Sequence, residues 1–348
     1  MRCRAVAIGP PNRKSSSALL TGRPIMQTSL RFGSLRMLSI LGLAIVGVTS
    51  AARAQSDGAD GAAQNMTLTT VDGQPIAITY YPAIPEKNPG GLQNAGVIVL
   101  LHGDDKGRIL WDKASAPAAN AKTFPVQLQD KGFAVITVDL RKFGDSKPAA
   151  GQPAVRPIDY ELMAANDLAV VKRFIYEEHQ QQKLNMNKTA IVAVGPTAPV
   201  AATFAAADWA AAPYDDAPVE ENKTPRGQDV RALVLLSPDS GAGRMATSKS
   251  INFLRNPQLG VALLVIVGQK DSGDKGQAKK LYELMETGQR KDETPRVYML
   301  SPNLKDRGLG LIGKMPDAVE APMIKFLDMH VAQAPSEWRD RADKVTRK

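Results

Sequence analysis

Short, uninterrupted apolar runs that alternate with helix-like segments constrain the fold of this chain more than any other feature of its sequence. A strand with one face in water alternates apolar and polar residues, whereas a strand buried on both faces is apolar throughout. The pattern therefore predicts an α/β fold with a mostly parallel central sheet flanked by helices on both faces. The six runs lie at residues 97–101, 134–138, 189–194, 232–236, 263–267 and 297–300.

The residues around these runs predict the remaining elements. An alternating pattern on either side of Asp72-Gly73 predicts an antiparallel hairpin over residues 66–71 and 75–80. Gly132 is expected to end one helix in the left-handed conformation. Apolar residues at helical spacing predict helices over residues 124–131, 160–184, 278–285 and 322–331.

The first 54 residues have the composition of an export signal. Arg31 and Arg36 precede an apolar run at residues 37–48, and Ala52-Arg53-Ala54 supplies the small residues of a cleavage site. The run is shorter than the roughly 20 residues that a membrane-spanning helix needs. We therefore expect a bacterial-type signal peptide, cleaved after Ala54, and a periplasmic or secreted protein with no stable membrane anchor. Part of the leader can be an upstream extension from a misassigned start.

The charge and the cysteine content of the chain indicate which partners, disulfides and cofactors we expect. The leader holds eight of the 44 Lys and Arg residues and no acid, so the rest of the chain has 36 basic and 35 acidic residues. The basic isoelectric point is thus a property of the leader, and we expect no nucleic-acid partner. Cys3 is the single cysteine, so the mature protein has no disulfide. We find no metal-ligand cluster and no Gly-rich phosphate loop, and expect no cofactor or metal.

These patterns divide the chain into four parts. Residues 1–54 are the signal peptide, residues 55–65 a Gly/Ala/Asp-rich flexible spacer, and residues 66–333 a single α/β domain. The charged residues 334–348 are expected to form a polar tail that frays. Within the domain, residues 213–229 are expected to form a surface loop. Residues 237–260 are too few for a separate lid domain.

Three stretches resemble the α/β-hydrolase superfamily. Residues 97–103, which end in His102-Gly103, are similar to the strand and His-Gly turn of these enzymes. Residues 132–141 are similar to the next strand and its Asp-x-Arg turn, which Phe143-Gly144-Asp145-Ser146 continues. Lys142 stands where the family usually has Gly. The resemblance covers about residues 66–331 and is greatest to small lidless esterases of the dienelactone-hydrolase type.

The resemblance implies where the catalytic groups would lie. The family's Gly-x-Ser-x-Gly turn corresponds to Gly195-Pro196-Thr197-Ala198-Pro199, so Thr197 replaces the nucleophilic Ser. A β-branched residue resists the positive φ of such a turn. The turn of His102, Gly103 and Asp104, together with the amide of Ala198, corresponds to the oxyanion hole.

The acid has a counterpart in this sequence, but the base does not. Asp271 follows the fifth run and is similar to the family's acid, with Asp239 as an alternative; each can equally be an ordinary turn residue. Arg307 occupies the position of the catalytic His. A guanidinium stays protonated to above about pH 12 and cannot act as a general base. The triad is therefore degenerate.

Other groups are weaker candidates for the missing roles. His179 and His330 are expected at helix ends or in packed positions. A hydroxyl nucleophile needs a base beside it, and Lys270 or Lys305 could serve only if strongly desolvated. Ser237 and Ser240 lie near expected strand ends but not in an elbow.

Two classes of function follow from this reading. The first, which we favour, is a catalytically inactive pseudohydrolase whose cleft binds a small molecule or a protein, or acts as a scaffold. The second is a weak or unconventional ester or amide hydrolase that uses Thr197 and Asp271. The sequence names neither a ligand nor a substrate.

Overall fold

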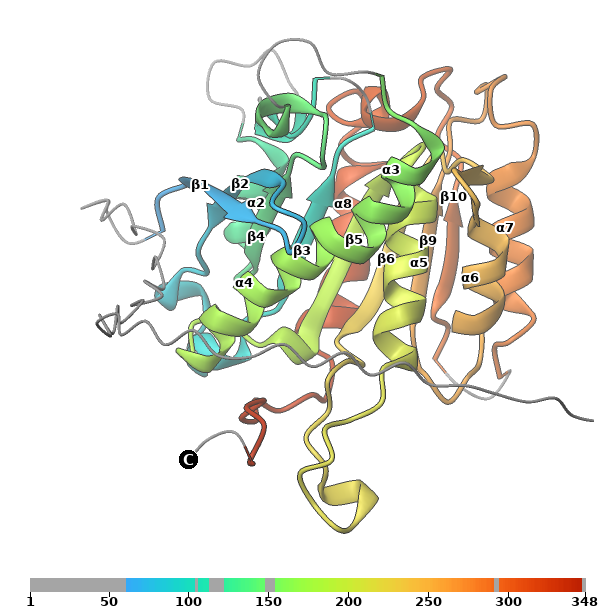
Figure 1. Ribbon diagram of the computed structural model, residues 1–348. Helices are drawn as coiled ribbons and strands as arrows, with labels where there is room; N and C mark the ends of the chain where they lie inside the picture. The colour runs from blue at the N-terminus through green and yellow to red at the C-terminus, as the bar shows by residue number, and fades with distance from the viewer. Residues whose placement is uncertain (1–60, 104–105, 113–121, 148–153, 291–293, 346–348) are drawn as a thin grey trace, which may run out of the picture. The chain divides into compact units, whose positions relative to one another are not determined.

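The computed structural model describes residues 61–103, 106–112, 122–147, 154–290 and 294–345 (Figure 1). The chain divides into two units, residues 1–54 and residues 55–348, and every described residue belongs to the second unit. The predicted signal peptide, its cleavage site, most of the spacer and Asp104 lie outside the described residues. No helix among the described residues is long and apolar enough to cross a membrane.

An eight-stranded sheet in the order β1-β2-β4-β3-β5-β6-β9-β10 forms the centre of the domain. Neighbouring strands from β4 to β10 run parallel, whereas β1 pairs antiparallel with β2 and β2 with β4. The predicted fold class is therefore confirmed, as are the six apolar strands and the hairpin. The strands are β1 (Gln64–Thr69), β2 (Pro75–Tyr81), β3 (Val97–Leu101), β4 (Ala134–Val138), β5 (Thr189–Val194), β6 (Val230–Leu236), β9 (Ala262–Ile266) and β10 (Val297–Leu300); β7 (Gly241–Ala242) and β8 (Met245–Ala246) form a small separate hairpin.

Helices cover both faces of the sheet because its inner strands are apolar on both sides (Figure 1). Helices α4, α5, α6 and α7 pack on one face, and α1, α2 and α8 on the other. The helices are α1 (Ile109–Asp112), α2 (Phe124–Gln129), α3 (Pro157–Leu162), α4 (Leu168–Gln180), α5 (Thr197–Ala210), α6 (Thr247–Leu254), α7 (Gln277–Glu286) and α8 (Glu320–Leu327). Short 3₁₀ turns lie at Pro85–Lys87, Leu92–Asn94, Gly144–Ser146, Met186–Lys188, Glu220–Asn222 and Gly308–Leu311.

The long helix predicted over residues 160–184 is interrupted. A π-helical turn, Met163–Asp167, separates α3 from α4, and a second one, Asp328–Ala332, follows α8. The first turn coincides with Asp167, a fully buried carboxylate that accepts hydrogen bonds from the backbone amide and the guanidinium of Arg141. The spacing of the apolar residues does not indicate that Asp167 is buried and hydrogen-bonded at this turn. The sequence therefore predicts one continuous helix.

The expected fraying of the C-terminal tail is wrong for residues 336–341. Asn185 donates a side-chain hydrogen bond to the carbonyl of Ser336 (2.9 Å), and the Trp338 indole donates to the carbonyl of His179 (2.9 Å). Arg341 is 3 % exposed and forms an ion pair with Asp229. A buried cation with a buried counter-ion holds this segment on the domain, although its composition is that of a solvated tail.

Candidate functional site

The carboxyl ends of β3, β5, β6, β9 and β10 place the residues predicted from the hydrolase resemblance at one edge of the sheet. In parallel α/β sheets, ligands bind at this edge, outside the carboxyl ends of the strands. The loops that follow these strands therefore define the candidate site.

Thr197 begins α5 directly after β5, but its hydroxyl faces the strand. The Oγ1 atom accepts a hydrogen bond from the amide of Val194 and donates one to the carbonyl of Val194, both at 3.0 Å. The residue is 2 % exposed. The residue of this turn with a positive φ (+52°) is Gly195. The turn thus avoids the conformation that a β-branched residue resists, and it does not present the hydroxyl to a substrate.

The groups expected to form an oxyanion hole are also committed elsewhere. The amide of Ala198 donates to the carbonyl of Gly195 (3.1 Å), and Ala198 is completely buried. His102 is 1 % exposed, and its Nε2 accepts a hydrogen bond from the amide of Leu140 (3.3 Å). Gly103 lies against β5, where a Cβ atom would come within 2.5 Å of a Val194 methyl. These contacts fix the turn in place and leave Ala198 without a free donor.

Arg307 joins the two acids that the sequence left as alternatives. Its Nη1 donates to Oδ2 of Asp271 (3.1 Å), and its Nη2 donates to Oδ1 of Asp239 (2.6 Å). The Asp271 side chain is 5 % exposed, whereas those of Arg307 and Asp239 are 37 % and 38 % exposed. Both carboxylates therefore pair with the permanently charged Arg307. The resemblance implies a histidine at this position, with one carboxylate that orients it.

Backbone contacts hold the three loops of this ion pair network together. The amide of Gly308, which has φ +57°, donates to Oγ of Ser237 (3.0 Å). The amide of Asp239 donates to the carbonyl of Gly195 (3.1 Å), which joins the network to the turn before α5. The amide of Lys270 donates to the carbonyl of Leu304 (2.9 Å). The structure thus brings together the turn of Thr197 and the loops of Asp239, Asp271 and Arg307.

Neither lysine considered as an alternative base is desolvated. Lys270 and Lys305 are both exposed, so neither has the burial that an amine base requires. His179 lies at the end of α4, and His330 packs between Tyr298 and Phe326 with ring centroids 5.7 and 4.9 Å away. We therefore assign both histidines a structural role.

The conformation of Ser237 is another feature that the sequence did not predict. It follows β6 with a φ of +44°, and it is completely buried. A non-glycine residue in the left-handed region costs about 1–2 kcal/mol. The following Pro238 favours an extended conformation in the residue before it, so the sequence gives no signal for the left-handed backbone of Ser237.

The Asp-x-Arg turn after β4 is occupied by structural ion pairs. Asp139 is 1 % exposed and binds the guanidinium of Arg108 and the amide of Asp145. Lys142 has a φ of +69°, which explains the family's preference for Gly here, and its amine binds Asp159 at 2.6 Å. Burial opposes the ionised form of Asp159, but hydrogen bonds from Arg156 and Lys142 lower its pKa to about 2.

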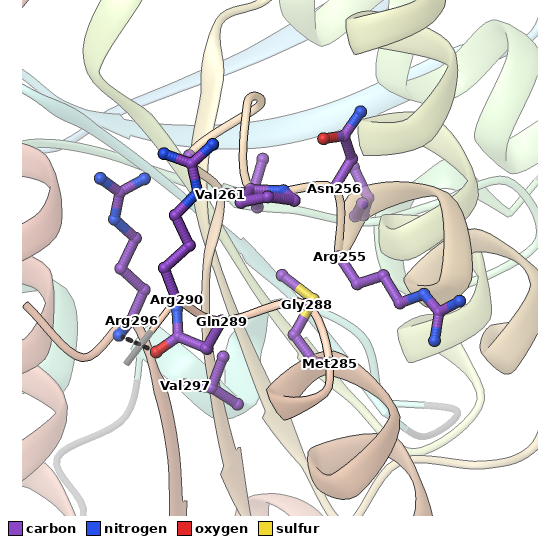
Figure 2. A pocket seen from close by; sticks show the side chains of 12 residues that line it. Arg255, Asn256, Val261, Met285, Gly288, Gln289, Arg290, Arg296 and Val297 are labelled. Atoms are coloured by element: carbon purple, nitrogen blue, oxygen red, sulfur yellow. Dashed lines mark hydrogen bonds between the residues drawn. The ribbon is translucent and has the colours of Figure 1, made fainter. Parts of the chain in front are cut away.

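A hollow of about 270 Å³ lies away from this site, beside the ends of α6 and α7 and the start of β10 (Figure 2). Figure 2 shows Arg290 and Arg296 side by side, with Arg255 directed away from them. Arg255 follows the C-terminus of α6 and donates to the hydroxyl of Thr287 at the end of α7 (2.9 Å). Arginines at helix C-termini stabilise the helix dipole. We therefore assign this hollow a structural role.

Among the described residues, no group of three His, Cys, Asp or Glu side chains could hold a metal ion.

Comparison with known proteins agrees with this architecture. No protein-family model and no curated sequence matches the chain. Among solved structures, the esterase Pf2001 of Pyrococcus furiosus has a TM-score of 0.52 and 13% identity, with 78% of this chain and 92% of the esterase covered. DcsB, solved with a substrate analogue, has a TM-score of 0.51 and 16% identity, with 78% of this chain and all of DcsB covered. The acylaminoacyl peptidase of Pyrococcus horikoshii has a TM-score of 0.52 and 11% identity over 80% of this chain and 43% of the peptidase.

These likenesses and the strand order establish the fold class. The chain has the α/β-hydrolase fold, with its candidate site at the edge of the sheet where the strands end. At such low identity, the likeness extends to the fold alone.

Proposed function

We propose that this protein is a catalytically inactive protein with the α/β-hydrolase fold, a pseudohydrolase that acts in binding or as a scaffold. The observation that carries the proposal is the pairing of Arg307 with both Asp239 and Asp271. Arg307 then takes the place of the base among the described residues, and a hydroxyl without a base is weakly nucleophilic near neutral pH.

The environment of Thr197 supports the same proposal. Its hydroxyl hydrogen is donated to the Val194 carbonyl, so transfer to a base would break a buried hydrogen bond. Loss of a single triad member commonly lowers turnover by about 10⁴-fold or more, and the losses do not add because the triad acts as a unit. Two replaced members and a misdirected hydroxyl leave no route to efficient ester or amide hydrolysis.

We further propose that the protein is exported and that the mature chain begins at Gln55. The support is the leader sequence, in which the apolar run at residues 37–48 precedes Ala52-Arg53-Ala54. N-terminal sequencing of the exported protein should return Gln55. A mature chain that retains residues 37–48 would contradict this part of the proposal.

Labelling with a serine-directed fluorophosphonate tests the absence of catalysis. We expect no stoichiometric labelling of the wild-type protein and no turnover of p-nitrophenyl acetate above that of Thr197→Ala. Thr197→Ser and Arg307→His should each remain at this background. The double variant should gain little, because the positive φ lies at Gly195 and the hydroxyl at position 197 still faces Val194.

The same experiment separates the two classes of function. Rapid labelling of the wild-type protein that disappears in Thr197→Ala would show an active hydrolase and overturn the proposal. Labelling that persists in Thr197→Ala but is lost in Ser237→Ala would place the nucleophile in the strained turn after β6. That outcome would also make the protein an enzyme.

A further inference from the structure

The C-terminal residues 336–341, which we call the strap, cross the end of the sheet opposite the candidate site. They contact the end of α4 and the turn that leads into β5, where Asn185 and Asn187 donate to the carbonyls of Ser336 (2.9 Å) and Glu337 (3.2 Å). In Figure 1 this red segment leaves the domain at the same end as the yellow loop of residues 211–229. The strap is thus attached at several points along its length.

His179 lies at the centre of this contact and is completely buried. Its ring packs on Trp338 with centroids 5.1 Å apart, and its carbonyl accepts a hydrogen bond from the Trp338 indole (2.9 Å). Its Nδ1 accepts a hydrogen bond from the amide of Met186 (3.2 Å). The other nitrogen, Nε2, lies 2.9 Å from the carbonyl of Arg339 and must therefore carry the hydrogen.

The contact with the Met186 amide requires an unprotonated Nδ1, whereas the Nε2 hydrogen bond to the Arg339 carbonyl is made by either form of the ring. A second proton would sit on Nδ1 and point at the Met186 amide, which is itself a donor, so protonation breaks that bond. We propose that residues 336–341 are an acid-released strap, in which protonation of His179 frees the C-terminal segment from the domain.

The electrostatic surroundings of His179 favour the neutral form. Burial lowers the pKa of His179 below 6.5, and the charge of Arg341 adds to this shift. The hydrogen bonds to the carbonyls of Arg339 and Leu184 and the charge of Asp229 oppose it. The charged groups on the segments around His179 and the strap are Glu178, Lys183, Lys188, Asp229, Arg231, Glu337, Arg339, Asp340 and Arg341.

The lowered pKa of His179 determines how the opening of the strap depends on pH. In the released state His179 has its ordinary pKa of about 6.5, so that state takes up the proton first as the pH falls. The strap is therefore fully closed above pH 6.5 and loosens as the pH falls toward the lower pKa of the closed state. If only the released state were protonated, the opening equilibrium would rise by at most about 25-fold between pH 7 and pH 5.

Release of the strap also removes support from a neighbouring crevice. Met186 and Asp229, which contact His179 and the strap, line a mostly apolar crevice of about 350 Å³ between α4 and α5. Lys172, which also lines the crevice, pairs with Asp208 and Asp229. The strap thus braces one wall of this crevice through both contacts.

Hydrogen exchange of the full chain at pH 7 and pH 5, corrected for intrinsic exchange rates, tests the proposal. We expect protection of residues 336–341 to fall between about fivefold and 25-fold at pH 5 while the sheet stays protected. His179→Gln should abolish this pH dependence. His330→Gln is the matched control, because His330 also has a lowered pKa, and it should behave as the wild type.

Several outcomes would overturn the proposal. Unchanged protection at pH 5, or equal loss in strap and sheet, excludes a separate acid-released segment. A pH dependence that survives in His179→Gln assigns the effect to the Lys172, Asp208 and Asp229 cluster instead. If His179→Gln does not fold, the emission of Trp338, identified by subtraction of Trp338→Phe, must change reversibly between pH 7 and pH 5 in the wild type, and constant emission refutes the proposal.

Discussion

Replacing Arg341 with alanine should destabilise the domain more than its place near the C-terminus suggests. The guanidinium is buried and binds the carboxylate of Asp229, the side chain of Asn187, and the carbonyls of Pro225 and Gly227 (both 3.0 Å). Removal of one partner from a buried ion pair costs about 3–5 kcal/mol, because the other charge stays buried. Lys172 still lies 2.9 Å from Asp229 and compensates in part, so we expect the lower end of this range.

Thermal and denaturant unfolding of the wild type and Arg341→Ala provide the measurement. For a domain of this size, each kcal/mol lowers Tm by about 2–4 °C, so Tm should fall by about 6–12 °C. Arg173→Ala is the matched control, because Arg173 forms an exposed pair with Glu177 at 3.5 Å and such pairs contribute about 0–1 kcal/mol. A loss below about 1 kcal/mol in Arg341→Ala, or equal losses in the two variants, would show that the buried ion pair does not stabilise the domain.

Two further predictions concern buried polar groups. Thr197→Val removes the hydroxyl that satisfies the Val194 amide, so unfolding experiments should show a loss of about 1–3 kcal/mol with no change in esterase background; an unaffected stability would contradict the geometry. Burial, followed by the charge of Arg296, lowers the pKa of His330 to about 4. The unfolded chain then binds the proton first, so stability falls as the pH drops from about 6.5 toward 4. In His330→Leu, Tm measured from pH 7 to 4 should fall less than in the wild type, and parallel curves would show that His330 does not contribute.

The sheet could be predicted from the sequence because burial on both faces leaves its strands as uninterrupted apolar runs. The run at residues 97–101 coincides with β3, and the one at residues 134–138 with β4. The positions of Asp239, Asp271 and Arg307 were also predictable, because each follows a recognisable strand.

The contacts between these side chains could not be predicted in the same way. Spacing along the chain places Asp239 and Asp271 at one edge of the sheet, but it does not reveal that Arg307 binds both. Likewise, the charged composition of the tail does not reveal that Arg341 has a buried counter-ion in Asp229. Long-range ion pairs depend on tertiary geometry, and local composition carries no record of them.

The left-handed residue before α5 has a consequence for stability. A glycine adopts this conformation at almost no cost, so Gly195 spares the turn the strain that a non-glycine residue would store there. Strained sites lower the stability of a fold, so an unstrained turn favours a stable start of α5. Gly195→Ala should therefore destabilise the domain even though no atom lies within 4 Å of the added Cβ, because the cost lies in the backbone conformation. The conformation of one glycine thus sets how much side-chain change this turn tolerates.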